Sequence, residues 1–334
     1  VGSWVTQINA SKYDPAEAVI VINNYRRNDW KPYVFKTNNY GKSWKSIANE
    51  EDVWGHALSF VQDPIEPNLQ FLGTEYGLYV TLDNAKTWTK WTSGYPTVST
   101  MDLKIHPREH DLVIGTFGRA AYILDDIRPL REMASTKKDL MKKRLHFFEP
   151  PTAVLAINRQ ASGTRFEANA IFTGKNRGRG AMLTFVFNSD KKKKEKPKKD
   201  KGDKKGKPED KKEKVTMEVL DEDGKVIRTV KHNVEAGINR VYWGLRRKGV
   251  RSPNAPKPTK PDAKEPGGPP VLPGEYTIRL SHGTDTTTHV VNVISDPRVG
   301  INTRNLEQLQ PIYERQMEIT ALVTKAMDRI RKSK

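Results

Sequence analysis

"TNNYGKSW" at residues 37–44 has a counterpart 44 positions later, "TLDNAKTW" at residues 81–88. The stretches share four side-chain types at one spacing: Thr37, Asn39, Lys42 and Trp44 against Thr81, Asp83, Lys86 and Trp88. Self-similarity at a spacing of about 20 to 50 residues indicates a repeated structural unit. The surrounding sequence is therefore expected to hold further copies.

The repeat continues on both sides of these stretches. "LQFLGTEYGLYVTLD" (69–83) recurs as "DLVIGTFGRAAYILDD" (111–126), and "AVIVINNYRRNDWKPYVFKTNN" (18–39) is a third, longer copy. Each copy alternates short β-branched and aromatic runs with turn residues, which predicts strands. A period of 42 to 44 residues with four strands is typical of a β-propeller blade. Residues 1–135 are thus predicted to form about three blades.

The quoted stretches fall in the turn between the third and the outer strand of a blade. An Asp or Asn in such a turn accepts hydrogen bonds from backbone N–H groups, glycine supplies a positive φ, and the tryptophan packs between blades. Asn39 replaces the acid in the first copy, and Ala85 replaces the glycine in the second. We expect Asp83 to be structural and not catalytic.

Composition excludes several classes of function. The net charge is +18, but residues 190–214 hold 14 lysines and seven acids without one arginine or aromatic residue. Such a run is typical of a solvated loop, so we expect no nucleic-acid partner. The chain has no cysteine, no apolar run of the about 18 residues that a membrane span needs, and no P-loop or zinc motif. We expect no metal, no cofactor and no membrane span.

The second half of the chain predicts a different domain. Strand-like runs between residues 145 and 298, separated by turns such as "DEDGK" and "HGTD", favour an immunoglobulin-like β-sandwich. Two insertions, the Lys-rich 190–214 and the Pro-rich 251–273, are predicted to be disordered and to project from it. Residues 303–334 have apolar side chains at helical spacing and predict a C-terminal helix. The fold class is therefore all-β, with a partial propeller, a sandwich and one terminal helix.

Consecutive motifs in the first 135 residues resemble those of a known protein family. "PNLQFLGTEYGLYVTLDNAKTW" and "IHPREHDLVIGTFGRAAYILDDIRPLRE" resemble the closing blades of sortilin/VPS10-like proteins, and the repeated turn is similar to the Asp-box of BNR repeats. Bacterial members are often labelled glycosyl hydrolases. "GINRVYWGL" and "LPGEYTIRL" are similar to the FlgD-type immunoglobulin-like domain that follows such propellers. The resemblance implies the C-terminal portion of a secreted or cell-envelope bacterial protein.

Loops at one end of the predicted blades are rich in aromatic and arginine side chains. They supply these candidate ligand-binding residues: Tyr25, Arg26, Trp30, Trp54, His56, Tyr76, Tyr95 and Arg119. Such side chains in a concave site suit a peptide or a carbohydrate, and Arg119 is the preferred anchor. The structural alternative is that Trp54 and His56 close a blade core and that Arg119 pairs with Asp125 or Asp126. We expect a non-catalytic binding or scaffold module, with an envelope protein complex among its partners.

A glycoside hydrolase is the alternative that the family label implies. Such enzymes need two carboxylates at the scissile bond, and the loops offer these candidates: Asp29, Glu50, Glu51, Asp52 and Glu75. No pair stands out, so a catalytic partner would have to come from blades outside this sequence. Three blades cannot close a ring, and the remaining blades are expected from a missing N-terminal part or from another chain.

Overall fold

The computed structural model describes residues 2–136, 139–157, 174, 176–189, 213–259, 263–300 and 303–333. The chain divides into two compact units, Val1–Asp139 and Leu140–Lys334. Apart from one parallel strand pair in unit 2, both are built from antiparallel pairs, and the fold is all-β with one long helix at the C-terminal end, as the sequence predicts. The core of the Lys-rich insertion, residues 190–212, lies outside the described residues.

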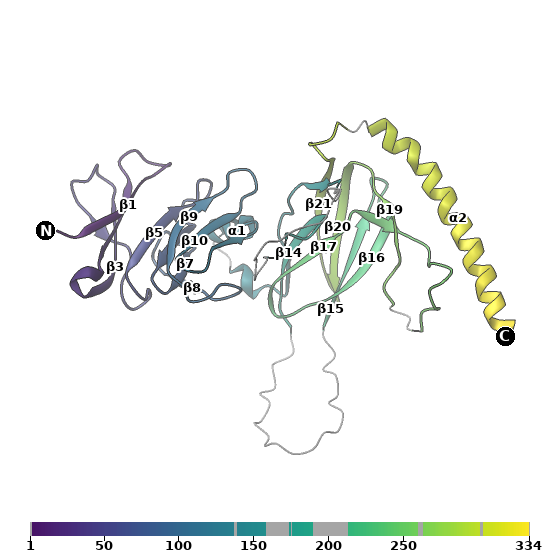
Figure 1. Cartoon of the computed structure of the whole chain (residues 1–334), viewed down its shortest axis with the longest axis horizontal. Helices are drawn as coiled ribbons and strands as arrows, with labels where there is room; N and C mark the ends of the chain where they lie inside the picture. Colours follow the sequence, from purple (N-terminus) through teal and green to yellow (C-terminus); the bar gives the residue numbers. More distant parts are fainter. Residues whose placement is uncertain are drawn as a thin grey trace, which may run out of the picture. The chain divides into compact units, whose positions relative to one another are not determined.

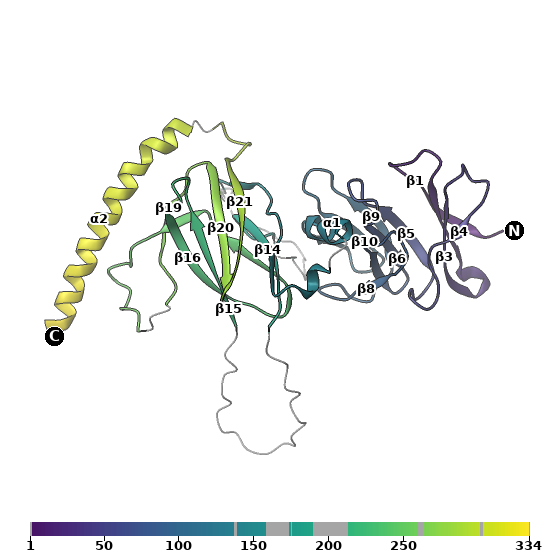
Figure 2. The same cartoon turned by 180° about the vertical axis from the view of Figure 1, so that it is seen from behind.

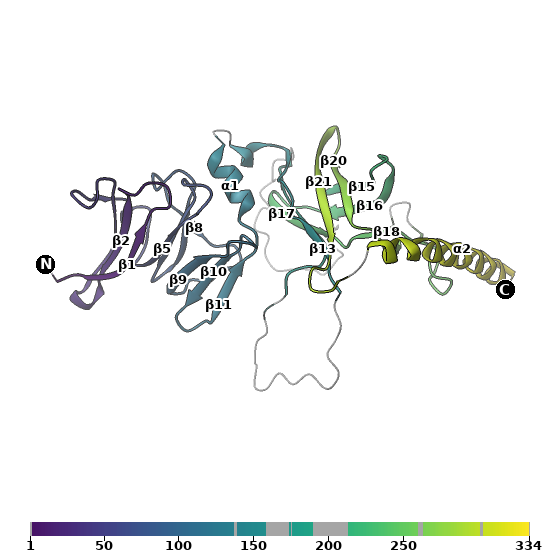
Figure 3. The same ribbon diagram turned by 90° about the horizontal axis from the view of Figure 1, so that it is seen from above.

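Unit 1 is a partial β-propeller of three consecutive sheets, which follow one another in Figures 1 and 3. The first blade contains β1 (Trp4–Ala10), β2 (Ala18–Asn24), β3 (Asp29–Thr37) and β4 (Lys45–Ser46). The second contains β5 (Ala57–Gln62), β6 (Gln70–Thr74), β7 (Gly77–Thr81) and β8 (Thr89–Trp91). The third contains β9 (Thr100–Ile105), β10 (Leu112–Thr116) and β11 (Ala121–Leu124). The third blade thus has three strands, where the sequence predicts about four.

The three blades share one irregularity in the first strand. In each blade, the first strand carries a one-residue register shift at the same place. The shift lies between Val5 and Gln7 in β1, between Ala57 and Ser59 in β5, and between Thr100 and Asp102 in β9. A one-residue bulge bends a strand and increases its twist. The shared bulge therefore gives the three sheets the same shape, which the sequence repeat alone does not reveal.

The two repeated turns also match. The side chain of Asp83 accepts hydrogen bonds from the backbone N–H groups of Lys86 and Thr87, both at 3.0 Å. Asn39 accepts the equivalent bond from the N–H of Ser43 at 3.0 Å. Ala85 has a φ of 60° where the aligned glycine has 80°. Ala85 therefore keeps the left-handed backbone conformation of the aligned glycine, although this conformation is unfavourable for a residue with a side chain.

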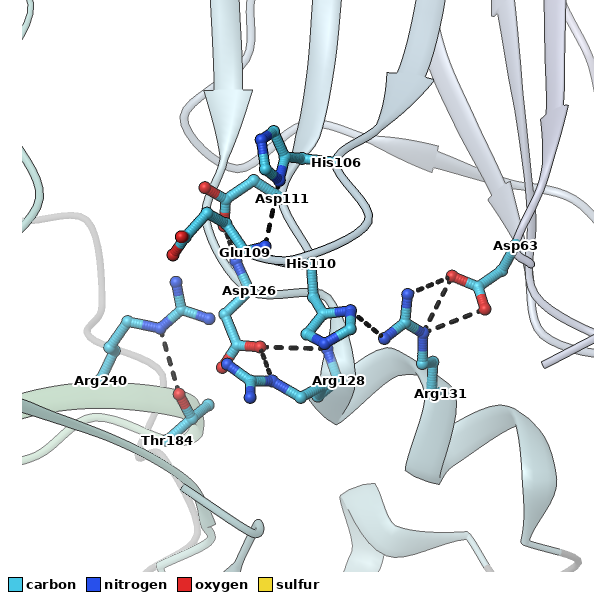
Figure 4. A network of polar contacts seen from close by, with 10 residues as sticks. All are labelled: Asp63, His106, Glu109, His110, Asp111, Asp126, Arg128, Arg131, Thr184 and Arg240. Carbon is cyan, nitrogen blue, oxygen red and sulfur yellow. Dashed lines mark hydrogen bonds and ion pairs between the residues drawn. The ribbon is translucent and has the colours of Figure 1, made fainter. Parts of the chain in front are cut away.

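After the third blade, the chain forms α1 (Arg128–Ser135), which ties this blade to the second. Arg131 of α1 donates to both carboxylate oxygens of Asp63 at 2.8 to 3.0 Å, and both side chains are buried. Arg131 Nη1 also lies 2.9 Å from Nδ1 of His110 (Figure 4). Because a bidentate pair fixes both position and orientation, this contact locks the helix onto the blades.

Unit 2 contains a β-sandwich whose five-stranded sheet is seen from both sides in Figures 1 and 2. That sheet contains β13 (Ala153–Leu155), β21 (Asp285–Ser295), β20 (Gly274–His282), β15 (Lys214–Leu220) and β16 (Val226–Asn233). The facing sheet contains β12 (Leu145–Phe147), β14 (Ala181–Phe187) and β17 (Gly237–Trp243). Phe185 and Leu183 of β14 pack with Met217, Leu280 and Val291 in one buried core. Shared burial of apolar side chains from both sheets defines the sandwich.

The Pro-rich stretch differs from the prediction of a disordered insertion. Its end forms β19 (Gly267–Pro270), which pairs with β18 (Arg246–Lys248), and Val271 is buried in the sandwich core. Proline is tolerated here because a two-stranded ribbon has free edges. Residues 260–262 lie outside the described residues.

The predicted terminal helix is α2 (Thr303–Ser333). Arg251, in the Pro-rich stretch, forms an ion pair with Asp328, and the hydroxyl of Thr324 donates to the carbonyl of Arg251 at 2.8 Å. A short 3-10 turn at Leu140–Lys142 completes the elements of this unit. No helix among the described residues is long and apolar enough to span a membrane.

Candidate ligand-binding site

Loops of all three blades meet at one end of unit 1. The N–H of Glu75 donates to the carbonyl of His56 at 3.2 Å, and the hydroxyl of Ser99 donates to the carbonyl of Glu75 at 3.4 Å. The N–H of Phe117 then donates to the carbonyl of Ser99 at 3.0 Å. These hydrogen bonds join the loops of the second and third blades, and ring contacts with His56 connect them to the 23–33 loop of the first blade.

Three aromatic rings from two of these loops form the centre of the site, which we call the aromatic cluster: Tyr25, Trp30 and His56. The Tyr25 ring stacks on the His56 imidazole with centroids 5.1 Å apart and an interplanar angle of 21°. Trp30 lies 5.6 Å from His56 and 6.3 Å from Tyr25. His56 is buried, whereas Tyr25 and Trp30 are 38% and 49% exposed. The cluster therefore presents two ring faces over a buried imidazole.

Local backbone structure explains how Tyr25 and Trp30 come together. Tyr25 begins the 3-10 turn η1 (Tyr25–Arg27), which ends at Asn28 with a left-handed φ of 58°. Asparagine tolerates this conformation better than most residues. The Asn28 side chain also accepts a hydrogen bond from the indole N–H of Trp30 at 3.2 Å. One tight turn therefore returns the chain and orients the indole.

Arg26 extends the site toward the start of the chain. Its guanidinium lies 5.3 Å from the Trp4 ring centroid and 5.7 Å from that of Tyr25, and its Nε donates to the Tyr25 hydroxyl at 3.1 Å. Cation–π contacts at such distances hold an arginine over aromatic faces. Sequence reasoning missed Trp4, since β1 gives no signal that its first residue reaches this loop.

His56 is the buried polar group of the site. Burial lowers the pKa of its imidazole, and Glu75, whose Oε2 lies 3.7 Å from Nε2, opposes that shift. The ring is therefore neutral at pH 7 and holds one N–H and one lone pair. Within the described structure, the buried Nδ1 has no hydrogen-bond partner. An unsatisfied buried nitrogen costs free energy, which a ligand group or a water molecule would recover.

Trp54 and Tyr76 lie on the neighbouring turns and are exposed, at 70% and 44%. The N–H of Trp54 donates to the hydroxyl of Tyr79 at 3.0 Å. Gly55 has a φ of 79° and packs so closely on the Tyr76 ring that an added Cβ would lie 2.6 Å from Cδ2. Glycine is therefore required here both by conformation and by space.

Tyr95 and Arg119 lie outside the aromatic cluster. Tyr95 is buried between the second and third blades, where its hydroxyl bonds that of Thr100 at 2.6 Å and its ring meets Tyr122 edge-on. Tyr95 is thus a core residue and is not exposed to a ligand. Arg119 lies on the exposed turn between β10 and β11. Asp126, one of the acids considered as its internal partner, instead pairs with Arg128 at 2.5 Å.

Three of the five candidate carboxylates, Asp29, Glu50 and Glu75, contact neighbouring side chains. Asp29 accepts hydrogen bonds from the Tyr33 hydroxyl at 2.9 Å and from Asn24, and the Tyr33 bond is the main cause of its lowered pKa. Glu50 pairs with Lys31 at 3.4 Å, and Glu75 faces His56. A glycosidase acid needs a raised pKa, so Asp29 is unsuited to that role.

A groove of about 670 Å³ lies away from the aromatic cluster, along the repeated turns of the first two blades. Its lining includes Trp44, Trp88 and three lysines, and Asp52 is its one acidic residue. Trp88 is buried there, whereas the aligned Trp44 is 41% exposed. The groove therefore offers apolar and cationic groups but no carboxylate pair. Among the described residues, no group of three or more His, Asp or Glu side chains could hold a metal ion.

Comparison with known proteins gives little further guidance. No protein-family model and no curated protein matches the chain. Among solved structures, the GH74 enzyme of Niastella koreensis is 16% identical, with a TM-score of 0.32 over 45% of this chain and 24% of that one. The extracellular domain of a one-component system from B. thetaiotaomicron is 11% identical, with a TM-score of 0.21 over 89% of this chain and 37% of that one. Similarity at this level identifies neither the fold nor the function of this chain, which spans well under half of either protein.

Proposed function

We propose that this protein is a non-catalytic binding module whose ligand, a peptide or a carbohydrate, docks on the aromatic cluster. The observation that carries the proposal is the meeting of Tyr25 and Trp30 from one loop with His56 from another, with the two larger rings partly exposed and a buried imidazole nitrogen unsatisfied. Aromatic side chains dominate binding hot spots because they bury much area at a small entropic cost.

The chemistry of the cluster favours a ligand with both apolar faces and polar groups. The rings of Tyr25 and Trp30 suit the C–H face of a sugar or a peptide side chain, and Arg26 next to them is a fixed donor for hydroxyl or carboxylate oxygens. His56 Nδ1 would pair with a ligand hydroxyl or amide. Arg119 stays in the proposal as a contact on the same loop surface.

The test begins with glycan and peptide arrays probed with the labelled chain, followed by calorimetric titration of the best binders. Trp30→Ala and Tyr25→Ala should each weaken binding by about 10- to 100-fold, the usual loss at a hot spot. Trp44→Ala and Tyr40→Ala remove exposed rings outside the cluster and serve as matched controls. Equal losses in the controls, or none in the cluster variants, would refute the site.

The second candidate, a glycoside hydrolase, receives no support from a specific contact. Asp29, Glu50 and Glu75 each contact a neighbouring side chain, namely Tyr33, Lys31 and His56. We therefore expect residues 1–334 to release no sugar from chromogenic or oligosaccharide substrates. Turnover that is lost in Glu75→Gln but kept in Trp30→Ala would favour the hydrolase.

The proposal also includes an extracytoplasmic location, either secreted or in the cell envelope. Its support is the absence of cysteine from 334 residues, because stray thiols are a liability in oxidising compartments. Fractionation of cells that express the parent protein tests the location, and recovery in the cytoplasm alone would contradict it.

A further inference from the structure

The first blade carries a row of apolar side chains on the sheet face that points away from the second blade. Ile8 of β1 pairs with Ile20 of β2, and Ile20 pairs with Phe35 of β3, so the three side chains lie on one face of the sheet. Ile8 is 70% exposed, and the other two are half-buried. We call these three residues the open row.

The open row has an equivalent in each of the other blades. The cross-strand partners in the second blade are Phe60, Leu72 and Tyr79, and those in the third are Leu103, Ile114 and Tyr122. Residues that occupy the same register position on the same strands of a repeat face the same way. The open row is therefore one of three copies of a single structural feature.

The other two copies are covered by the preceding blade. Phe60, Leu72 and Tyr79 are buried in one cluster with three valines of the first blade, Val19, Val21 and Val34. In the same way, Leu103 and Ile114 are buried with Phe71, Leu78 and Val80 of the second blade. In both contacts, a row of this kind packs against the opposite face of the blade before it.

The tryptophan of the repeated turn also contacts the preceding blade where that blade is present. The indole N–H of Trp88 donates to the carbonyl of Ile47, in the first blade, at 2.8 Å, and Trp88 is buried. Trp44 holds the equivalent position in the first blade and is exposed. A contact made by Trp88 to the preceding blade therefore has no counterpart at Trp44 among the described residues.

From these equivalences we infer that the open row and Trp44 form a docking surface for one further four-stranded antiparallel sheet of the same repeat. This sheet lies on polypeptide other than these 334 residues. It presents a small β-branched face, like that of Val19, Val21 and Val34, and a carbonyl for the Trp44 indole. Packing of this kind follows the geometry that the two existing contacts already use.

A second copy of this chain is a poorer occupant. The matching face of its third blade carries Asp102 and Lys104 at the register positions that Ser59 and Val61 hold in the second blade. Docking through that face would remove two charges from water without an assigned partner, which is costly. The charge pattern therefore favours a separate sheet over self-association.

The absence of cysteine makes a thiol-labelling test direct, because Ile8→Cys introduces the single thiol of the chain. An extended chain carries an added copy of residues 1–56 joined to Val5. This junction repeats the native one, since Val5 aligns with Ala57, which follows His56. We expect the thiol at position 8 of the original blade to react at least about tenfold more slowly in the extended chain than in the native chain, as protection by packing requires.

Two controls fix the interpretation. Tyr40→Cys, on an exposed turn, should react equally fast in both chains. Val21→Asp with Val34→Asp in the added copy should restore fast labelling at position 8, because charges spoil the covering face. Unchanged labelling in the extended chain, whether or not the added residues fold, would overturn the proposal. Protection in the native chain that rises with protein concentration would also overturn it, in favour of a second copy.

Discussion

Ala85 and Gly41 adopt the same left-handed backbone in two aligned turns, with φ values of 60° and 80°. An L side chain is strained there, whereas glycine is not, although glycine is more costly to order from the unfolded chain. We expect Ala85→Gly to stabilise the protein by about 0.5 to 1 kcal/mol and Gly41→Ala to destabilise it by about 1 kcal/mol. Urea unfolding of the two variants measures both. The same sign for both substitutions would show that packing around the turn, and not backbone strain, decides.

His110 makes stability depend on pH. Arg131 only donates hydrogen bonds, so Nδ1 of His110 must accept, and the ring is neutral. Burial, and then the charge of Arg131, lowers the pKa of His110. The folded state thus binds fewer protons than the unfolded state, whose histidine pKa is about 6.5. Stability is complete above that pH and falls as the pH drops toward the lowered pKa of the folded state.

The matching prediction concerns the slope of stability against pH. His110→Gln keeps an acceptor for Arg131 but removes the titrating group. We expect the variant to lose less unfolding free energy than the parent between pH 7 and pH 5. His56 and His232, whose pKa values burial also lowers, keep part of the slope. Parallel slopes for the parent and the variant would contradict the assignment to His110.

At the scale of elements, α1 depends on the buried pair of Arg131 and Asp63. Removing one member of a buried ion pair leaves an uncompensated charge, at a cost of about 3 to 5 kcal/mol. We therefore expect Arg131→Ala to lower the unfolding free energy of unit 1 by about 3 kcal/mol. Arg108→Ala, which removes an exposed arginine, should change it by less than about 0.5 kcal/mol. A small effect of Arg131→Ala would mean that α1 is held by its apolar side alone.

The C-terminal helix is tethered by polar contacts at one stretch. Thr324→Val removes the hydrogen bond to the Arg251 carbonyl, and Arg251→Ala removes the ion pair to Asp328. The double variant should speed hydrogen exchange in α2 by about tenfold or more while β14 and β20 keep their protection. Thr320→Val, which removes a hydroxyl bonded only within the helix, is the control. Loss of protection in the sandwich as well would mean that α2 is part of its core.

Much of this element structure is predictable, for identifiable reasons. The strands of the second blade follow from β-branched runs between turns, and β14 is one of the strand-like runs expected between residues 145 and 298. The bulges could not be predicted, because a one-residue register shift leaves no trace in the pattern of apolar and polar residues. The three-stranded third blade also differs from the prediction of about four strands. The β18–β19 ribbon differs from the expected disorder because proline is compatible with pairing at the free edges of a two-stranded ribbon.

The aromatic cluster was partly predictable. Loops at one end of equivalent blades must lie together, so Tyr25, Trp30 and His56 could be nominated. Tyr95 could not be assigned correctly, because the sequence does not distinguish a buried aromatic residue in a loop from an exposed one. Trp4 could not be predicted, because nothing in the sequence of β1 indicates that its first residue lies next to Arg26.

For the molecule as a whole, the central claim is that the aromatic cluster binds a ligand. Each of the seven tryptophans gives one indole N–H signal in a ¹H–¹⁵N spectrum, and the sites differ in surroundings. Trp30 donates to Asn28 in the cluster, Trp88 to Ile47 between blades, and Trp243 to Arg246 in the sandwich. Titration with the best binder from the glycan and peptide arrays should shift the Trp30 signal and leave those of Trp88 and Trp243 in place. Shifts confined to Trp44 and Trp88, which line the groove along the repeated turns, would contradict the account.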